Sequence, residues 1–520
     1  MKTIGLIGGV TAPKYERLFR LLGEFFSVQF VSRTAAQMGG LNALIVQGDA
    51  LEPKALSATL PTFCVVTNQS PTPFETMSVQ FNSAEWLPAA LRRRRMITPE
   101  TDRASALQIS DSHDVLATIE DRPVWAGDAA GRQFVSVPLP ELEEGQQLSE
   151  FFNGEFFLRL LPLYLFLRRL TDEGWESPPL RACLLVDDPN LRSQTYGRID
   201  YRKLVTLAER RRFHVAMATI PLDAWQVSPR AARIFREHSA QLSLLIHGNN
   251  HTRFELAQTF SEERGLSLLA EALRRADALE KKSGVEICRV MAPPHGVCLE
   301  SMLRAMFALG FAGVTTNRWS LWKFNDLSRQ PAWIGLRPAN MFADGLPVVN
   351  RFRFNSSIAE NEAVIAALLG QPIIPYGHHQ DFADDMTAVT KIVDSINSLG
   401  DVRWMNMSDI LRTNFESRLE GDTLQLRLFS REVHLTLPAS VSRLQIISTD
   451  DGAQRFTICA EETAASSAHF GETIAVKPGV KVIITIEPKA TIDYRTVNGR
   501  AVSPLIPLRR FASEMRDRLF

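Results

Sequence analysis

Short apolar runs alternate with amphipathic stretches over the first 145 residues of the chain. The runs TIGLIGG, SVQFVS, ALIVQG, FCVVTN and DVLATI each have the length of a strand. Between the first two, YERLFRLLGEFF places apolar residues at helical spacing. Strands that alternate with helices predict an open parallel sheet, and VWAGDAAGRQFVSVPL predicts a hairpin that closes it. We therefore expect an α/β open-sheet domain at residues 1–145.

Glycines follow the first predicted strand of this domain. Gly5, Gly8 and Gly9 do not form the GxGxxG pattern of dinucleotide-binding loops. The sequence therefore disfavours a dinucleotide site, and we expect a non-catalytic domain that resembles the flavodoxin-like or amidotransferase-like class.

Eight further apolar runs follow between residues 180 and 410, namely ACLLVD, HVAMAT, LSLLIH, ICRVMA, AGVTT, LPVVN, PIIPYG and VRWMN. Helical stretches separate most of them, and the clearest, at 262–282, has one apolar face. Seven or eight strand–helix units in a row predict a β/α barrel. The runs are apolar throughout, as expected for a sheet buried on both faces. We assign this (β/α)7–8 barrel to residues 146–418.

The pattern changes again after residue 418. TLQLRLF, EVHLTL, RLQIIS and VKVIITIE read as strands, several with apolar residues at every second position. Turn residues separate them and no long helical pattern intervenes. The sequence predicts a small all-β sandwich domain at 419–500 and a C-terminal helix or tail at 501–520.

Composition excludes several classes of protein. Lys+Arg and Asp+Glu both total 58, so the formal net charge is zero and no nucleic-acid partner is expected. The most apolar segment, 156–169, is too short to cross a bilayer and contains Arg159 and Pro162. The chain starts without the pattern of a secretory signal, and its five cysteines lack paired spacing. We expect a cytoplasmic protein, and its oligomeric state stays open.

Polar residues stand where the predicted barrel strands end. Asp187 and Asp188 end the first strand, His247 and His251 follow the third, His295 follows the fourth, and His378 and His379 follow a late one. Carboxyl ends of barrel strands share one mouth, so these side chains are expected to converge there. HxxxH allows both imidazoles to face one ion if the chain turns helical after the strand. Two imidazoles and one carboxylate form a usual catalytic zinc triad.

The three motifs LLVDDPN, IHGNNH and MAPPHG resemble, in that order, those of the polysaccharide deacetylase family, carbohydrate esterase family four. The resemblance covers roughly residues 180–410. It implies a distorted, chitooligosaccharide-deacetylase-like β/α barrel and metal-dependent hydrolysis of N-acetyl groups on sugars. The implied metal is Zn²⁺, with Co²⁺, Ni²⁺ and Mn²⁺ as alternatives.

The resemblance also implies roles for individual residues. Asp187 matches the catalytic base. His378 or His379 matches the histidine that protonates the leaving group, and His378 is preferred because it comes first after the strand. The backbone N–H at His295, beside Pro294, matches the oxyanion donor. The metal ligands are matched by Asp188, His247 and His251.

Departures from the family pattern concern the surroundings of the site. Ala292 stands where the family has an arginine that steadies the catalytic aspartate, and Arg289 is a candidate substitute. His295 replaces an aromatic residue, and Trp319 or Trp333 could supply the family's tryptophan. Asn250, with its neighbour Asn249, either lines the substrate cleft or holds the turn.

Three functions compete on this basis. The first is a hydrolase of an acylated sugar or small amide. The second is a hydrolase of a non-sugar C–N bond, since a barrel does not determine its substrate. The third is a non-catalytic carbohydrate-binding or scaffold protein.

Overall fold

The computed structural model describes residues 1–34, 37–48, 60–67, 74–172, 174–326, 331, 334–342, 345–383, 386–447, 455–460, 465–488, 490–499 and 504–519. Contacts within the chain divide it into two compact units. The first comprises Met1–Glu173, Ser328–Leu336 and Glu360–Leu368, and the second comprises Gly174–Leu327, Arg337–Ala359 and Leu369–Phe520.

The first unit is built on a nine-stranded sheet of order β2-β1-β3-β4-β9-β8-β7-β5-β6. The half from β2 to β9 is parallel, as the sequence predicts, and the rest is antiparallel. The strands are β1 (Lys2–Gly8), β2 (Val28–Ser32), β3 (Ala43–Gly48), β4 (Thr62–Val66), β5 (Ser78–Phe81), β6 (Arg95–Ile97), β7 (His113–Ile119), β8 (Arg122–Asp128) and β9 (Gln133–Val135).

The predicted hairpin is formed by β8 and β9, but the antiparallel half extends beyond it to β7, β5 and β6, where the sequence pattern predicts a parallel sheet. Glu120 and Asp121, between β7 and β8, both have positive φ, 50° and 59°. A two-residue turn of this kind joins antiparallel strands, whereas parallel strands need a long crossover. Because this connection is so short, the chain reverses and β8 runs antiparallel to β7.

Helices α1 (Glu16–Phe26) and α2 (Leu161–Thr171) belong to the first unit. The ring of Tyr164 in α2 lies 5.5 Å from that of Phe26, and Phe166 lies 5.5 Å from Phe63 of β4. The boundary predicted after residue 145 assigns α2 to the second domain. Its contacts place it with the first unit instead, because its apolar face packs on α1 and the sheet.

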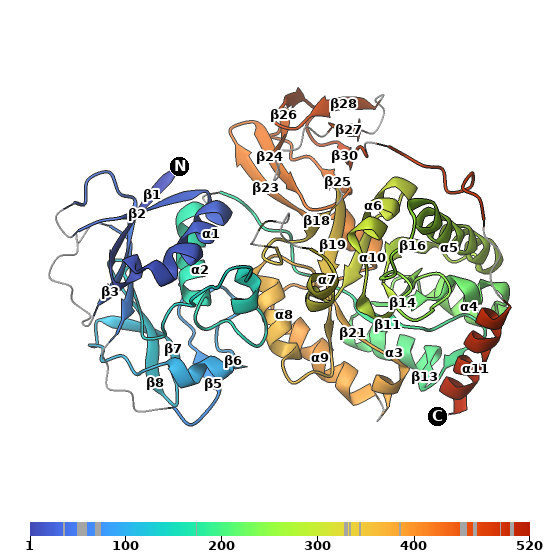
Figure 1. Ribbon diagram of the computed structural model, residues 1–520, viewed down its shortest axis with the longest axis horizontal. Helices are drawn as coiled ribbons and strands as arrows, with labels where there is room; N and C mark the ends of the chain where they lie inside the picture. Colours follow the sequence, from blue (N-terminus) through green and yellow to red (C-terminus); the bar gives the residue numbers. More distant parts are fainter. Residues whose placement is uncertain are drawn as a thin grey trace. The chain divides into compact units, whose positions relative to one another are not determined.

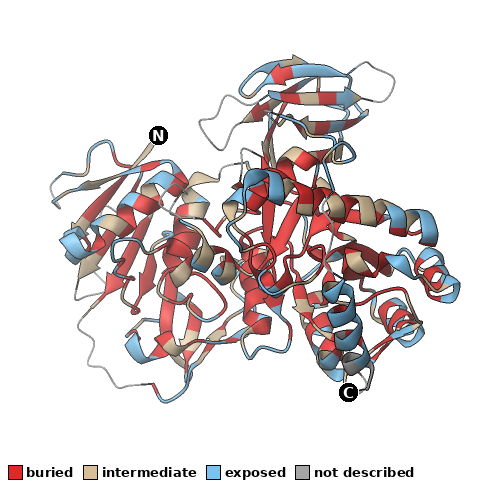
Figure 2. Ribbon diagram, turned by 45° about the vertical axis from the view of Figure 1, so that its right-hand side comes forward, coloured by how far each residue is buried: buried red, intermediate tan, exposed pale blue. Residues whose placement is uncertain are grey.

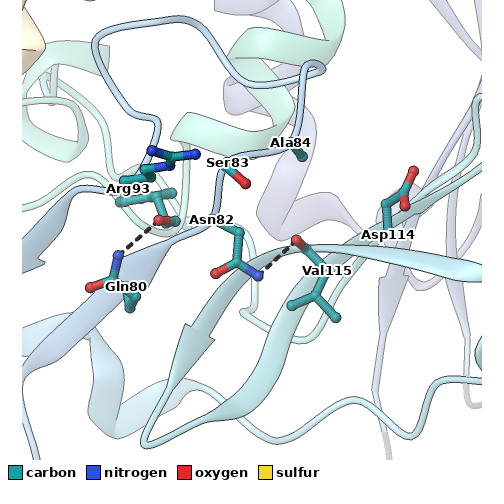
Figure 3. A pocket seen from close by; sticks show the side chains of 8 residues that line it. Gln80, Asn82, Ser83, Ala84, Arg93, Asp114 and Val115 are labelled. Atoms are coloured by element: carbon teal, nitrogen blue, oxygen red, sulfur yellow. Dashed lines mark hydrogen bonds between the residues drawn. The ribbon is translucent and has the colours of Figure 1, made fainter.

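A cavity of about 430 Å³ lies in this unit beside β5 and the start of β7 (Figure 3). Asn82 spans it by donating from Nδ2 to the carbonyl oxygen of Val115, at 3.0 Å. Asp114 is the one carboxylate and Arg93 the one cation among its lining residues, and histidine is not among them. The cavity therefore offers no set of metal ligands.

The second unit contains another nine-stranded sheet, of order β18-β19-β17-β16-β15-β14-β11-β21-β20. Its eight strands from β19 to β20 are parallel, and β18 is antiparallel at the edge. They are β11 (Leu184–Asp187), β14 (Val215–Thr219), β15 (Leu242–Ile246), β16 (Ile287–Met291), β17 (Gly313–Thr316), β18 (Asn340–Phe342), β19 (Leu346–Asn350), β20 (Phe352–Arg353) and β21 (Pro375–Gly377).

Strands β11, β14 and β15 are buried along their whole length, which explains why the sequence shows continuous apolar runs (Figure 2). The last predicted run, VRWMN, instead contributes β22 (Arg403–Trp404), which pairs with β10 (Arg181–Ala182) outside the large sheet. Among the described residues the ladder ends at β18 and β20, so closure into a barrel stays a prediction.

Helices separate the strands of the second unit (Figure 1). The predicted helix at 262–282 is α5 (Glu262–Ser283), capped by the Ser261 hydroxyl and ended by Gly284 at φ 65°. The others are α3 (Tyr201–Arg211), α4 (Pro229–Glu237), α6 (Glu300–Leu309), α7 (Arg318–Phe324), α9 (Thr387–Asn397) and α10 (Met407–Arg412), while α8 (Ala359–Leu368) belongs almost wholly to the first unit.

The predicted β-rich segment forms two four-stranded sheets, β23-β24-β26-β29 and β25-β30-β27-β28. Alternate residues are buried, for example Val482, Ile484 and Ile486. The strands are β23 (Phe415–Glu420), β24 (Thr423–Leu428), β25 (Glu432–Thr436), β26 (Arg443–Ile447), β27 (Arg455–Ala460), β28 (Ser466–His469), β29 (Thr473–Ala475) and β30 (Lys481–Ile486). The last helix is α11 (Leu505–Leu519).

None of the helices in the described ranges is long and apolar enough to cross a membrane. The cytoplasmic location and the lack of a nucleic-acid partner stay predictions.

Candidate metal centre

Two adjacent carboxylates stand at the carboxyl end of β11. Asp187 is the last residue of the strand and is 3% exposed. Asp188 follows at φ 83°, a left-handed conformation that is uncommon outside glycine. Its N–H donates to the carbonyl oxygen of Ala218 in β14 at 3.0 Å. The chain leaves the strand here, so the two side chains enter different surroundings.

Asp188 meets both histidines of the HxxxH pair. Its Oδ1 lies 3.7 Å from His247 Nε2 and 3.3 Å from His251 Nε2. Two ligands at Zn²⁺ distances in a tetrahedral site are about 3.3 Å apart. Asp188 Oδ1 is buried and has no hydrogen-bond partner in the part of the chain that the structure describes. A carboxylate oxygen without a donor, beside two imidazole nitrogens at this spacing, fits a divalent cation.

The protonation states of the histidines suit ligation. His247 Nδ1 donates to the carbonyl oxygen of Ala292 at 2.8 Å, which leaves the lone pair of Nε2 facing Asp188. Burial and the neighbouring His247 lower the pKa of His251 to about 4, so its imidazole is neutral at pH 7. Burial would raise the pKa of Asp188, but the two histidines and Arg510 outweigh it and hold this pKa below its ordinary value.

The HxxxH pair does not lie on a helix, contrary to the helical turn that its spacing suggests. Residues 247–252 form an irregular loop, with His251 at φ 55°. The carboxylate of Glu255 accepts backbone N–H groups from Asn249 at 2.8 Å, Asn250 at 2.9 Å and His251 at 3.3 Å. One buried carboxylate therefore fixes the loop that carries the second histidine.

The side chain of Asn250 also anchors this loop. Its Oδ1 accepts from Arg275 Nη1 at 2.9 Å, and the Oδ1 of Asn249 accepts from the same atom at 2.8 Å. These contacts favour the alternative in which both asparagines hold the turn over the one in which they line the substrate cleft.

Asp187 has a cationic partner that its sequence neighbourhood does not reveal. Arg351, directly after β19, donates from Nη1 to Asp187 Oδ1 at 2.8 Å, and both side chains are at most 4% exposed. Burial would raise the pKa of Asp187, but Arg351 and then His247 outweigh it and keep this pKa below the ordinary value. The carboxylate is therefore ionised at neutral pH.

Arg289, the candidate partner of Asp187 in the sequence, is not that partner in the structure. Arg289 pairs with Asp277 and Glu280 of α5, at 2.8 and 2.7 Å. It points to α5 because its side chain leaves β16 on the helix-covered face. A signal for Arg351 does exist in the sequence, since a charged residue directly follows the apolar run LPVVN.

The two late histidines have different surroundings. His378 is half-buried after β21, and its charge influences both Asp187 and His295. His379 is 2% exposed and packs edge-on against Tyr196, with ring centroids 5.6 Å apart. Asp381 accepts the backbone N–H of His378 at 2.8 Å and so anchors the turn. The electrostatic influence of His378 on Asp187, and the burial of His379 against Tyr196, favour His378 over His379 as the candidate acid.

His295 lies in the short turn after β16, near the candidate ligand His251. Its φ is 59°. Its ring lies 5.4 Å from that of His251 and 5.6 Å from that of Phe254. Pro294 is buried and packs closely on Gly248. A Cβ atom added to Gly248 would lie only 2.5 Å from Pro294 Cγ, so a larger residue would not fit there. Trp319 is 45% exposed, while Trp333 lies outside the described residues. His295 and Phe254 thus form an aromatic surface beside the cluster.

No protein-family model matches this chain, and no curated protein does. Solved carbohydrate esterases resemble it. A putative polysaccharide deacetylase from Mycobacterium smegmatis is 14% identical, with a TM-score of 0.32, and the match covers 45% of this chain and 92% of that one. A family 4 carbohydrate esterase from Streptomyces lividans in complex with acetate is 13% identical, with a TM-score of 0.27, covering 44% and 93%. A peptidoglycan deacetylase from Bacillus subtilis is 12% identical, with a TM-score of 0.26, covering 46% and 92%.

Two of these structures, from Mycobacterium smegmatis and Streptomyces lividans, bear the name of the family that the motifs LLVDDPN, IHGNNH and MAPPHG resemble. All three TM-scores are below 0.5, so the case for a function rests on the side chains. Those side chains comprise a cluster that could hold a cation, a carboxylate held ionised beside it, a half-buried imidazole and an aromatic surface. Together they have the components of a hydrolytic site.

Proposed function

We propose that this protein is a metal-dependent hydrolase that removes an acyl group, foremost an N-acetyl group, from a sugar or related amide. The observation that carries the proposal is the pair of adjacent carboxylates. Asp188 offers a bare oxygen to a cation, while Asp187 is already neutralised by Arg351. The parallel sheet that presents them is proposed to form the distorted β/α barrel of the deacetylase family.

Asp188, His247 and His251 would hold the cation, Zn²⁺ or alternatively Co²⁺, Ni²⁺ or Mn²⁺. When bound, it supplies Lewis acidity toward a water molecule and the acyl carbonyl group. The carboxylate of Asp187 accepts the proton of that water, and Arg351 keeps the carboxylate in place and ionised. The backbone N–H of His295 donates to the oxyanion.

Cleavage of the C–N bond requires a proton on the departing nitrogen. His378 donates this proton, so that water is consumed and a carboxylate and an amine are released. The rings of His295 and Phe254 can stack on the apolar face of a sugar, which favours a carbohydrate over a small aliphatic amide.

The test is acetate release by the full-length protein, stripped of metal and reloaded with Zn²⁺ or Co²⁺, from N-acetylated oligosaccharides, O-acetylated oligosaccharides and simple amides. We expect metal-dependent turnover of the N-acetylated sugars. Asp187→Asn should lower kcat by roughly 10³-fold, within the range for loss of a general base, while retaining the metal. Asp394→Asn, on an exposed ion pair with Arg211, is the matched control and should be unchanged.

Three outcomes would contradict separate parts of the proposal. Wild-type turnover by Asp187→Asn refutes the base. Protein that binds no cation refutes the metal centre. One bound cation without turnover of any N-acetylated sugar refutes the substrate class.

A further inference from the structure

The last helix of the chain reaches the candidate metal centre. Arg510 of α11 donates from Nη2 to the carbonyl oxygen of Asp188 at 3.4 Å, although it lies 322 residues further along the chain. The same nitrogen lies 3.4 Å from the Tyr196 hydroxyl and 2.9 Å from Asp223 Oδ2. Arg510 is 7% exposed. Its guanidinium is therefore a buried group in contact with the backbone of a proposed ligand.

Four buried charges hold α11 in this position. Asp223, in the turn after β14, pairs with Arg510 and with Arg192, both at 2.9 Å. Glu514, one turn further along α11, pairs with Arg192. All four side chains are at most 7% exposed. Two cations and two anions balance, so the network fixes the helix without placing a net charge beside a divalent cation.

The segment before α11 is also held along its course. Tyr494 donates to Asp277 of α5 at 2.8 Å, and Arg274 donates to the carbonyl oxygens of Tyr494 and Val497 at 2.7 and 2.9 Å. Ser267 of α5 donates to the carbonyl oxygen of Asn498 at 2.8 Å. The chain thus follows α5 before it forms α11, drawn in red in Figure 1.

Asp188 needs support of this kind because its backbone is strained. A residue other than glycine at φ 83° persists only where the surroundings impose the conformation. The bond from Asp188 N–H to Ala218 holds one side of the residue, and Arg510 contacts its carbonyl oxygen on the other. The direction of the carboxylate follows from the backbone that these two contacts constrain.

We propose that Arg510 is a positioning residue for the metal ligand Asp188, so that α11 is a working part of the metal centre. This inference rests on the proposed function only for the identity of the ligands. Arg510 also contacts the Tyr196 hydroxyl, and the Tyr196 ring packs on His379, beside the proposed acid His378. One guanidinium therefore braces both the ligand side and the acid side of the site.

The test is titration of the metal-free, full-length protein with Co²⁺, followed by visible absorption, which reports affinity and ligand geometry together. Arg510→Met should raise the Kd for Co²⁺ by about 10- to 100-fold, the usual cost of losing a group that orients a ligand, and should change the absorption spectrum. Arg510→Lys retains the charge but is shorter, so a smaller rise is expected. Arg509→Met, on an exposed position of the same helix, is the matched control and should behave as wild type.

The inference is overturned if Arg510→Met binds Co²⁺ with the wild-type Kd and spectrum, even if its Tm is lower, because Arg510 would then only stabilise the fold. If Arg510→Met does not fold, Arg510→Lys decides, and a wild-type Kd and spectrum for that variant also overturn it. Failure of the wild-type protein to bind Co²⁺ refutes the metal centre itself, an outcome distinct from either of these.

Discussion

The two sides of the candidate site are assembled in different ways. Two of the three candidate ligands are local, since His247 and His251 are four residues apart and Glu255, four residues further, fixes their loop. The base side joins the ends of three strands, with Asp187 at the end of β11, Arg351 after β19 and His378 after β21. Most of a candidate cation site can thus lie in a short segment, whereas an ionised buried carboxylate depends on the topology of the whole sheet.

The neighbouring carboxylates show the same contrast in their charge balance. Asp187 is neutralised within the protein by Arg351 at 2.8 Å. Asp188 Oδ1, one residue on, has no hydrogen-bond partner among the described residues and faces two imidazoles. Two groups with equal intrinsic chemistry are therefore suited to different tasks, which under the proposed function are those of a base and a ligand.

Replacing Arg351 should remove this difference between Asp187 and Asp188, and it should have the largest effect on activity and stability. In Arg351→Met the buried Asp187 loses its cation, so its pKa rises and less of the carboxylate is ionised. We expect kcat/KM at pH 7 to fall by roughly 10²–10⁴-fold and stability to fall by about 3–5 kcal/mol. Steady-state kinetics and thermal unfolding measure the two.

The pH dependence has a definite sign. The folded-state pKa of Asp187 is lowered, so the stabilisation by Arg351 is present above the ordinary aspartate pKa of about 3.9 and is lost as the pH falls through the folded value. Without Arg351, the acidic limb of the kcat/KM profile should move to higher pH. Arg289→Met, which breaks ion pairs to α5 instead, should leave the limb in place. An equal shift in both variants would contradict the assignment of Arg351 to Asp187.

The sequence singles out the three candidate ligands for a physical reason. Ends of buried parallel strands are marked by a switch from apolar to polar residues, and Asp188, His247 and His251 all stand at such switches. Arg351 stands at one too, but its pairing depends on the spatial order β11-β21-β20 and β17-β19, which periodicity does not contain. Arg510 has no signal, because its contact depends on the path of the chain after the β-rich segment.

The two late histidines provide an intermediate test of the base side. His378→Gln should lower kcat by roughly 10²-fold or more, as expected for loss of a general acid, with Tm nearly unchanged because the side chain is half-buried. His379→Gln should lower the stability and leave kcat nearly unchanged. It disturbs a buried ring packed on Tyr196, so we expect the free energy of unfolding to fall by about 1–3 kcal/mol. Loss of kcat only in His379→Gln would exchange the two roles.

The smallest effect is expected on the ligand side, at Glu255. In Glu255→Gln an amide NH₂ would replace one of the oxygens that accept the N–H groups of Asn249, Asn250 and His251. We expect a stability change of about 1 kcal/mol and a rise in the metal Kd of up to about tenfold. Burial raises the pKa of Glu255, although the three N–H groups oppose it.

The wild type should therefore lose part of its stability as the pH rises through the raised folded pKa of Glu255, and Glu255→Gln should not. Denaturant unfolding at several pH values, with Glu262→Gln on the exposed start of α5 as the control, measures this difference. An unchanged Kd would show that His251 keeps its place without Glu255. The ligand side would then depend, like the base side, on contacts from distant strands.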